Sequence, residues 1–422
     1  MRLIIVDPAH FHAALLQREM YQSVDSRAEV FAPVGPEVID YLTRVTAFHS
    51  RPQNPTRWDL DLHLSAAPLA PMEDLLRGKA GDVAVFTGRN RPKIDRILGA
   101  LRAGLHVLAD KPWIIESGDL PKLQEALELA DIRKLIAFDI MTERYEVTSQ
   151  LQREFVSHPE VFGAIETGSG DSPGIRARSV HHLMKMVAGV SLKRPAWFFD
   201  IGEYGEALAD VGTHVVDLVE WTGFANCPAI DPAADIGLIA GGRWPVHMTA
   251  EQFRKVTGTT RDGDLDYYCN NSVHYTWRGV HVHLEITWEW EAVPGGGDIY
   301  EAAFRGTKAL VEIRQGAAEH HRPEVYLAPT GATFAELRAA VQARVAQLQT
   351  RWPGLSVMEG KDDLRLAIPE EFRVGHEAHF AQVANRFFEC VAAPERLPAW
   401  ERPNMIAKYT VTTGGVDLGR RG

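Results

Sequence analysis

Short apolar runs alternate with helix-like segments over the first third of the chain. The runs cover residues 3–6, 29–32, 83–87, 106–108 and 134–138. The segments that carry apolar side chains at three- and four-residue spacings are residues 13–21, 92–103 and 120–129. This alternation predicts βαβ units, and the apolarity of the runs is typical of a parallel sheet buried on both faces. The pattern therefore predicts a doubly wound α/β fold for the first part, residues 1–140.

From about residue 145 the pattern changes to longer, visibly alternating strands. In residues 279–291 apolar side chains point to one side, and His, Glu and Thr side chains point to the other. A strict period of two is typical of a strand with one packed face and one wet face. Further strands are expected at residues 299–305 and 309–313, and helices at residues 334–348 and 376–391. Residues 409–416 form a short β-branched segment at the carboxyl end. The second part, residues 141–422, is therefore expected to be an α+β domain with a large open, mainly antiparallel sheet.

Composition and charge narrow the class of protein. The chain has 422 residues, 45% hydrophobic and 24% charged, with a net charge of −11, which fits a soluble globular protein and disfavours non-specific binding to nucleic acid or anionic lipid. Three scattered cysteines, Cys227, Cys269 and Cys390, cannot form a disulfide framework or a thiolate metal site. No apolar window approaches the roughly 20 residues that span a bilayer, and the first residues lack a secretory signal. We expect a cytoplasmic protein.

The turn after the first strand lacks the glycines that usually let a main chain approach a dinucleotide diphosphate. In the sequence Asp-Pro-Ala-His-Phe-His-Ala, the three glycine positions hold Asp7, Ala9 and His12. The Asp7 carboxylate is expected to repel a diphosphate. The second strand ends in Ala32-Pro33, which offers neither an acid for a free ribose nor an arginine for its phosphate. With no group to recognise the ribose phosphate of NADP, we expect NAD rather than NADP as the cofactor.

Two other segments favour nucleotide binding. Residues 104–112 end in Asp110-Lys111-Pro112, and residues 210–217 read Asp-Val-Gly-Thr-His-Val-Val-Asp. In this order they resemble the E-K-P and D-x-G-x-H-x-x-D segments of the Gfo/Idh/MocA oxidoreductases, the family of glucose-fructose oxidoreductase and inositol dehydrogenase. Weaker matches to the same family occur at residues 86–90, 139–145 and 305–309, where Lys93 replaces the usual His after the first of them. The turn at residues 7–13 and the segments 180–182 and 197–200 resemble a glycine-poor subgroup whose members mostly carry only the general name of oxidoreductase.

The resemblance implies an N-terminal Rossmann domain that binds NAD or NADP, followed by a substrate-binding and oligomerisation domain. It also implies a homodimer or homotetramer formed through the C-terminal sheet, and a carbohydrate-like small molecule as the substrate. The cofactor-binding candidates are His10, Phe11, His12, Ala32, Pro33, Thr87, Gly88, Asn90, Asp110, Lys111 and Arg144. The substrate-binding candidates are His181, His182, Lys185 and Asp217.

Hydride transfer from a secondary alcohol requires a base for the hydroxyl proton and a cation near the developing oxyanion. His214 is the candidate base and Lys111 the candidate cation. Asp210 lies four residues before His214, so both share one face if the segment is helical, and Asp210 can orient substrate hydroxyls. The alternative is an ordinary amphipathic helix with a buried valine and leucine stripe.

Several candidates have plainer interpretations. His181 and His182 could instead begin a helix, and Asp217 could support His214 or simply lie on a helix face. Two histidine pairs could chelate a metal, but their spacing is common on wet strand faces and differs from the zincin helix. These pairs are His281 with His283 and His376 with His379. No metal is expected.

The sequence therefore predicts a nicotinamide-dependent oxidoreductase that acts on a secondary hydroxyl of a sugar, polyol or glycoside. One alternative is an NAD-dependent enzyme that cleaves a glycosidic bond through a keto-sugar intermediate with no net redox change. Another, suggested by the missing glycines, is a cofactor-free sugar-binding or regulatory protein.

Overall fold

The computed structural model describes residues 1–77, 81–187, 190–225, 227 and 230–422. It divides into two compact units. The first contains Met1–Thr142, Gly202–Gly205 and Gly375–Arg402, and the second contains Glu143–Ile201, Glu206–Val374 and Pro403–Gly422. The sequence predicts one boundary near residue 140. In the structure, the first unit also includes two short segments from the later part of the chain.

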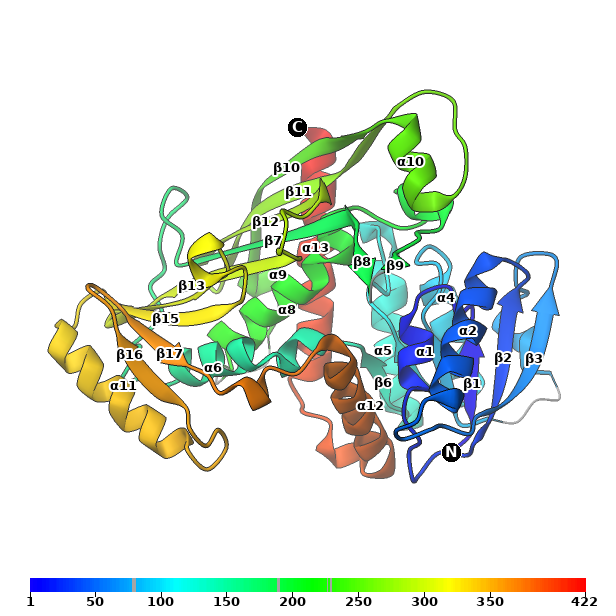
Figure 1. Cartoon of the computed structure of the whole chain (residues 1–422), viewed down its shortest axis with the longest axis horizontal. Helices are drawn as coiled ribbons and strands as arrows, with labels where there is room; N and C mark the ends of the chain where they lie inside the picture. The colour runs from blue at the N-terminus through cyan, green and yellow to red at the C-terminus, as the bar shows by residue number, and fades with distance from the viewer. Residues whose placement is uncertain (78–80, 188–189, 226, 228–229) are drawn as a thin grey trace. The chain divides into compact units, whose positions relative to one another are not determined.

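The first unit is built on a six-stranded sheet with the order β3-β2-β1-β4-β5-β6, in which every pairing is parallel. Its strands are β1 Leu3–Val6, β2 Arg27–Pro33, β3 Asp59–Ser65, β4 Val83–Phe86, β5 His106–Ala109 and β6 Ala137–Asp139. Its helices are α1 His12–Leu16, α2 Pro36–Ser50, α3 Met72–Leu75, α4 Lys93–Arg102, α5 Leu120–Arg133 and α12 His376–Ala392 (Figure 1). The side chains of β1 and β4 are buried along their whole length, as expected for a parallel sheet covered on both faces.

The predicted Rossmann-like class is confirmed, but β3 and α2 are elements that the sequence analysis missed. The strand β3 lies at the edge of the sheet, and its side chains are only partly buried. A partly exposed edge strand carries a weak apolar signal, which explains the omission.

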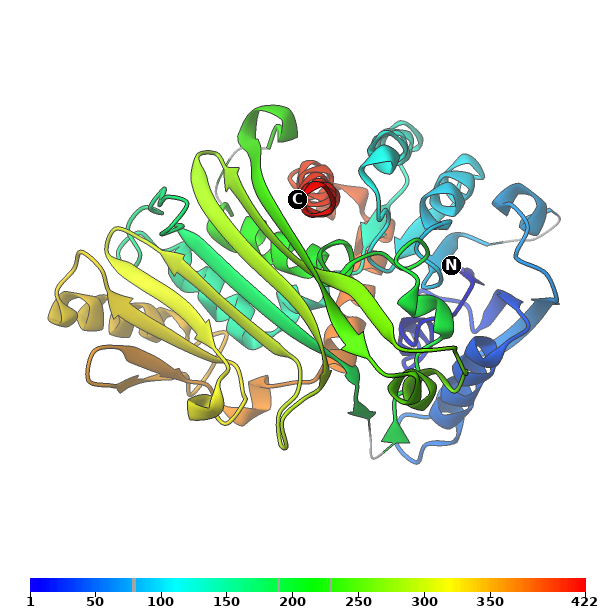
Figure 2. The ribbon, with the colours of Figure 1, turned by 90° about the horizontal axis from the view of Figure 1, so that it is seen from above.

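The second unit contains a nine-stranded sheet with the order β10-β11-β12-β7-β13-β14-β15-β17-β16 (Figure 2). All its pairings are antiparallel except that of β12 with β7. Its strands are β7 Ile175–Met184, β10 Ile236–Met248, β11 Leu265–Trp277, β12 Val280–Glu291, β13 Ile299–Arg305, β14 Ala309–Arg314, β15 Glu324–Pro329, β16 Ser356–Glu359 and β17 Leu364–Ala367. The alternation predicted for β12 is confirmed, since Val282 and Leu284 are buried while His283 and Glu285 are partly exposed.

Helices cover one face of this sheet, with α6 against β14 and α8 against β7. The helices of the unit are α6 Val147–Val156, α7 Ala207–Asp210, α8 Gly212–Gly223, α9 Pro232–Asp235, α10 Ala250–Thr257, α11 Phe334–Leu348 and α13 Glu401–Arg421. Two short strands, β8 Met186–Val187 and β9 Val190–Ser191, pair with each other. Among the described residues, the helices are too short or too polar to cross a membrane.

The carboxyl end is helical, which differs from its β-branched composition. Residues 409–416 lie within α13, where Val411 and Val416 are buried. A side chain at Gly415 would collide with Leu208 and Val273, so glycine lets the helix lie close to α7 and β11. Packing against the unit overrides the weak helix propensity of the branched residues.

Candidate functional site

The candidate residues of the first unit lie at the carboxyl edge of its sheet. Strands β1, β4 and β5 are neighbours, and Val6, Phe86 and Ala109 lie at the same level. The chain order reverses between β1 and β4, and ligands of open α/β sheets bind outside such a switch point. The turns that follow these strands hold His10, Phe11 and His12, then Thr87, Gly88 and Asn90, and finally Asp110 and Lys111. The structure therefore brings this group of predicted residues to one edge.

Asp7, the first residue after β1, is paired rather than free to repel a ligand. It has a positive φ of 51° and is buried. Its carboxylate accepts hydrogen bonds from the Arg89 main-chain N–H at 3.2 Å and from the Arg89 and Arg96 guanidiniums at 3.3 and 3.2 Å. A side chain at Gly88 would collide with this carboxylate, so the turn after β4 requires glycine there. The expectation that Asp7 repels a diphosphate is therefore corrected, because two cations offset its charge.

Asp110, the first residue after β5, lies between two histidines of the β1 turn. Its Oδ2 atom is 2.9 Å from Nδ1 of His10 and 2.9 Å from Nδ1 of His12. The Nε2 atom of His12 is 3.2 Å from Nε2 of His376, the first residue of α12. This contact of α12 with the turn was not visible in the sequence, because 364 residues separate the two rings.

Burial sets the protonation of this group. Burial lowers the pKa of His12 to about 4, and the neighbouring His10 and Lys111 also lower it, although Asp110 opposes them. Burial alone would raise the pKa of Asp110, but the His12 and His10 interactions outweigh it and hold that pKa well below its usual range. At neutral pH, His12 is therefore an uncharged imidazole beside an ionised carboxylate.

Lys93, at the start of α4, holds the loop that carries Lys111. Its buried ammonium donates to Oδ1 of Asn90 at 2.8 Å and to the main-chain oxygens of Asp110 at 2.9 Å and Pro112 at 3.0 Å. These two carbonyls flank Lys111. The sequence alone shows Lys93 only as a replacement for the histidine of the family pattern. A lysine among the apolar residues of a helix start is the signal that could have revealed its role.

Other predicted cofactor residues also lie at this edge. Asn90 donates its amide to the Tyr204 carbonyl at 2.6 Å, so both ends of its side chain have partners. Thr87 is buried, and its hydroxyl has no hydrogen-bond partner within the described part of the chain. Ala32 and Pro33 end β2, beside the turn whose Asp7 N–H bonds the Phe31 carbonyl at 2.8 Å.

In the second unit, Asp210 and His214 lie on consecutive short helices. Asp210 is the last residue of α7 and is buried, whereas His214 lies in the first turn of α8 and is partly exposed. The His214 N–H bonds the Val211 carbonyl at 3.0 Å, so the chain remains helical across the junction. The expected helical spacing of the acid and the histidine is thus present.

Arg144 and Asp217, predicted to bind cofactor and substrate, bind each other. The Arg144 guanidinium donates two hydrogen bonds of 2.6 Å to the two carboxylate oxygens, and the buried Lys408 of α13 lies 3.2 Å from Oδ1. Burial would raise the pKa of Asp217, but Arg144 and Lys408 outweigh it and lower that pKa to about 2. These contacts favour a supporting role for Asp217 over direct substrate binding. The contribution of Lys408 was missed, because the carboxyl end was not expected to be helical.

The remaining predicted substrate residues surround one carboxylate, Asp298, which precedes β13. His181 Nδ1 lies 3.0 Å and His182 Nδ1 3.2 Å from its oxygens, and the Lys185 ammonium also donates to it. Burial would raise the pKa of Asp298, but these histidines and Lys185 hold it well below its usual range. His181 and His182 lie in the strand β7, so the helix-start alternative is wrong. Asp298 was missed because it lies 113 residues from Lys185.

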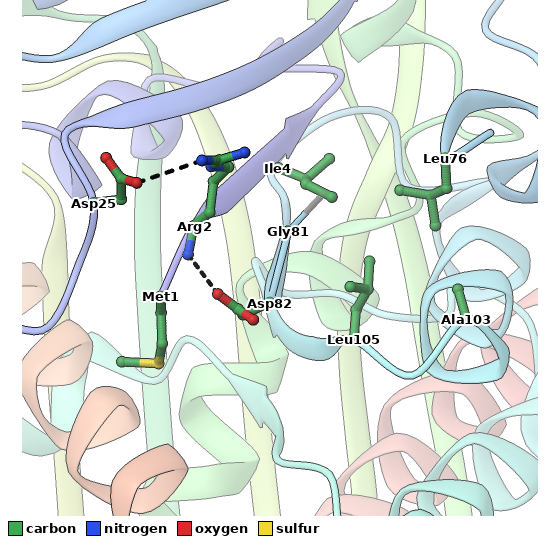
Figure 3. A pocket seen from close by; sticks show the side chains of 9 residues that line it. All are labelled: Met1, Arg2, Ile4, Asp25, Leu76, Gly81, Asp82, Ala103 and Leu105. Atoms are coloured by element: carbon green, nitrogen blue, oxygen red, sulfur yellow. Dashed lines mark hydrogen bonds and ion pairs between the residues drawn. The ribbon is translucent and has the colours of Figure 1, made fainter. Parts of the chain in front are cut away.

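A pocket of about 540 Å³ lies at the opposite, amino-terminal edge of the first sheet (Figure 3). It is lined by residues such as Arg2, Asp25 and Leu105, and it contains none of the candidate residues. The candidate residues of the first unit lie instead around the carboxyl ends of its strands.

Residues 151–420 match the family described as "Putative oxidoreductase C terminal domain". The chain belongs to this oxidoreductase family. A crystal structure named as a putative oxidoreductase from Parabacteroides merdae ATCC 43184 is 37% identical, with a TM-score of 0.95 over 100% of this chain and 97% of that one. No curated protein matches this oxidoreductase significantly.

Two more distant structures share its fold. GenD2 from gentamicin A biosynthesis, in complex with NAD, is 15% identical and has a TM-score of 0.60 over 100% of this chain and 94% of its own. KijD10, a 3-ketoreductase from Actinomadura kijaniata in complex with NADP and TDP-benzene, is 15% identical and has a TM-score of 0.59 over 100% and 97%. At this identity the likeness extends to the architecture of the oxidoreductase alone.

Proposed function

We propose that this oxidoreductase is a member of the Gfo/Idh/MocA family, of its glycine-poor subgroup, and uses NAD or NADP to oxidise a secondary hydroxyl of a sugar, polyol or glycoside, or to reduce the corresponding ketone. The observation that carries the proposal is that the Lys93 ammonium donates hydrogen bonds to the two carbonyls that flank Lys111, an arrangement called the Lys93 clamp below. It fixes a lysine at the carboxyl edge of the sheet, next to the strand-order switch. A positioned cation there suits an oxygen that gains negative charge.

The residues at this edge fit a dinucleotide. The Asp7 charge is offset by Arg89 and Arg96, which removes the main electrostatic objection to a diphosphate at the β1 turn. Ala13 is fully buried, so α1 lies close to the sheet. The N–H groups of Phe11 and His12, at the start of α1, would hold the diphosphate, because first-turn N–H groups have no partner within their helix. The buried Thr87 hydroxyl offers a further polar contact. NAD is proposed over NADP because Ala32 and Pro33 provide no group for a ribose phosphate.

Each catalytic residue has one task in this proposal. The bound nicotinamide supplies the hydride acceptor. His214 accepts the hydroxyl proton, Lys111 stabilises the negative charge on that oxygen, and Asp210 orients the substrate hydroxyls. His181, His182 and Lys185 contribute to substrate binding, with Asp298 holding their side chains. Arg144, with Asp217, supports the loop that begins the second unit.

We further propose a cytoplasmic enzyme that forms a homodimer or homotetramer through the wet face of the nine-stranded sheet. His281, His283 and Glu285 alternate with buried residues on β12 and belong to this face. Light scattering of the purified protein measures the oligomeric state directly.

The decisive experiment titrates the purified full chain with NAD(H) and NADP(H) and measures binding by isothermal titration calorimetry. Saturable binding followed by net NADH formation with a sugar or polyol supports the proposal. Binding with turnover of a glycoside but no net NADH would favour the redox-neutral cleavage instead. Failure to bind any of the four nucleotides would overturn both enzymes and leave a cofactor-free protein.

A further inference from the structure

Three potential metal ligands converge where β1 and β5 end in the first unit. Nδ1 of His10, Nδ1 of His12 and a carboxylate oxygen of Asp110 all lie within 4.8 Å of one another. The two histidines follow the same strand, separated by one residue, and Asp110 follows the strand two places away in the sheet. Two of these groups, His12 and Asp110, have side chains only 4% and 5% exposed.

The distances from the Asp110 carboxylate to the two histidine nitrogens suit neighbouring positions around an octahedral ion. With metal–ligand bonds of about 2.1 Å, such neighbours lie about 3.0 Å apart. Both histidine nitrogens lie 2.9 Å from Oδ2 of Asp110. The second oxygen, Oδ1, is buried and has no hydrogen-bond partner among the residues that the structure describes. A carboxylate with one free buried oxygen can bind a cation through one or both oxygens.

The types of side chain in the group also match a metal site. Two imidazoles and one carboxylate form the ligand set that binds non-haem iron and related ions. The buried His12 ring places its Nδ1 atom 2.9 Å from Oδ2 of Asp110, so Nδ1 is the atom positioned to act as a ligand. Its Nε2 then carries the proton and points to Nε2 of His376 at 3.2 Å. Metal-binding histidines commonly donate their second N–H in this way.

We propose that His10, His12 and Asp110 form a binding site for a divalent first-row transition metal ion. His10 is 37% exposed, so the site can be reached from solvent. Three protein ligands leave coordination positions for water or for an oxygen of a bound molecule. The same turn is proposed to contact the dinucleotide. The metal site is therefore proposed for the protein without cofactor, and it does not depend on the proposed hydride transfer.

Two neighbouring charges affect the affinity. Asp7 contributes little attraction, because Arg89 and Arg96 already pair with it. The Lys111 ammonium interacts electrostatically with His12, so its positive charge opposes the binding of a cation there. Removing that ammonium should therefore strengthen metal binding, whereas a metal bound elsewhere on the chain would not respond.

The test uses the full chain, stripped with a chelator and titrated with Co²⁺ while the visible d–d absorption is recorded. We expect one equivalent to bind, and His10→Gln and Asp110→Asn each to weaken binding by at least about 100-fold. His10→Gln alters a partly exposed side chain, so it preserves the test if Asp110→Asn fails to fold. Lys111→Met should bind Co²⁺ more tightly than the parent protein.

The matched control is His63→Gln. His63, Glu29 and Asp61 form a second group whose ligand atoms lie within 4.8 Å of one another, on β2 and β3. This variant should keep the full Co²⁺ spectrum. Absence of binding in the parent protein, unchanged binding in His10→Gln, or loss of binding only in His63→Gln would overturn the proposal. Nucleotide binding by the metal-free protein is measured in parallel, so failure of the metal site is distinguished from failure of the proposed enzyme function.

Discussion

The Arg144 guanidinium holds both carboxylate oxygens of Asp217 at 2.6 Å, inside the second unit. Lys408 approaches the same carboxylate at 3.2 Å, so two cations depend on one buried acid. Removing one partner of such a group leaves uncompensated buried charge. Asp217, the last residue of the segment that resembles the family motif, therefore also connects α8 to the loop at residue 144 and to the last helix.

Asp217→Asn should destabilise the protein by about 3 kcal/mol, the usual cost of breaking a buried ion pair. Urea unfolding of the purified variant measures this change. Glu125→Gln provides the control, because Glu125 pairs with Arg102 on the surface, where both side chains are 52% exposed. That pair should contribute no more than about 1 kcal/mol. Equal destabilisation by the two variants would contradict the buried-pair account.

The same carboxylate predicts an acid limit to stability. The pKa of Asp217 is about 2 in the folded protein, below its ordinary value of 3.8. Its contribution of about 2 kcal/mol is therefore present above pH 4 and is lost as the pH falls toward 2. Unfolding free energies measured across this range should fall less steeply in Asp217→Asn than in the parent protein.

Lys93→Met should lower both stability and turnover. The substitution leaves the Asn90 side-chain oxygen and the carbonyls of Asp110 and Pro112 without their donor, which costs about 1 to 3 kcal/mol. The resulting movement of Lys111 should reduce kcat by about 10- to 100-fold. The control is Lys122→Met, which removes a partly exposed lysine that pairs with Asp95 and Asp119. A normal kcat in Lys93→Met would show that the clamp does not position Lys111.

Lys111→Ala should lower turnover by about 100-fold or more, while the affinity for the nicotinamide cofactor changes far less. The reason is that the ammonium acts mainly on the reacting oxygen of the substrate. Steady-state kinetics and nucleotide titration of the same preparation separate the two effects. Near-normal turnover on the true substrate would remove Lys111 from the mechanism.

His214 should control the acid limb of the pH profile. A base must be neutral to accept a proton, so oxidation should slow as the pH falls through a single apparent pKa. His214→Asn should be slow and should lack this limb. If the variant retains both the limb and the rate, another group is the base.

Asp7→Asn should leave cofactor affinity unchanged or improve it, and it should also reduce stability. The variant removes the negative charge near the proposed diphosphate but leaves Arg89 and Arg96 without their anion. Ala13→Leu should instead weaken cofactor binding, because Ala13 is fully buried and a larger side chain would crowd α1 against the sheet. Nucleotide titration and urea unfolding of both variants check these directions. Loss of cofactor binding in Asp7→Asn would give the carboxylate a direct role.

The sequence by itself determined the fold class of the two parts and several of their elements. Periodicity defines a strand or helix locally, and the predicted β12, β13, α11 and α12 lie where their apolar spacing placed them. The resemblance to the Gfo/Idh/MocA segments, and not periodicity, pointed to Asp110 with Lys111 and to Asp210 with His214. Short-range spacing is enough to assign a strand or a helix, because each depends on only a few neighbouring residues.

The tertiary structure decided which side chains are partners. Asp7 appeared repulsive until Arg89 and Arg96 were found beside it, and Asp298 and Lys408 gave no signal of their own. These contacts join residues separated by 82 to 191 positions, so no local pattern encodes them. Burial then fixes the charge state, because a desolvated His12 loses its proton while a desolvated Asp217 keeps its charge only through its two cations.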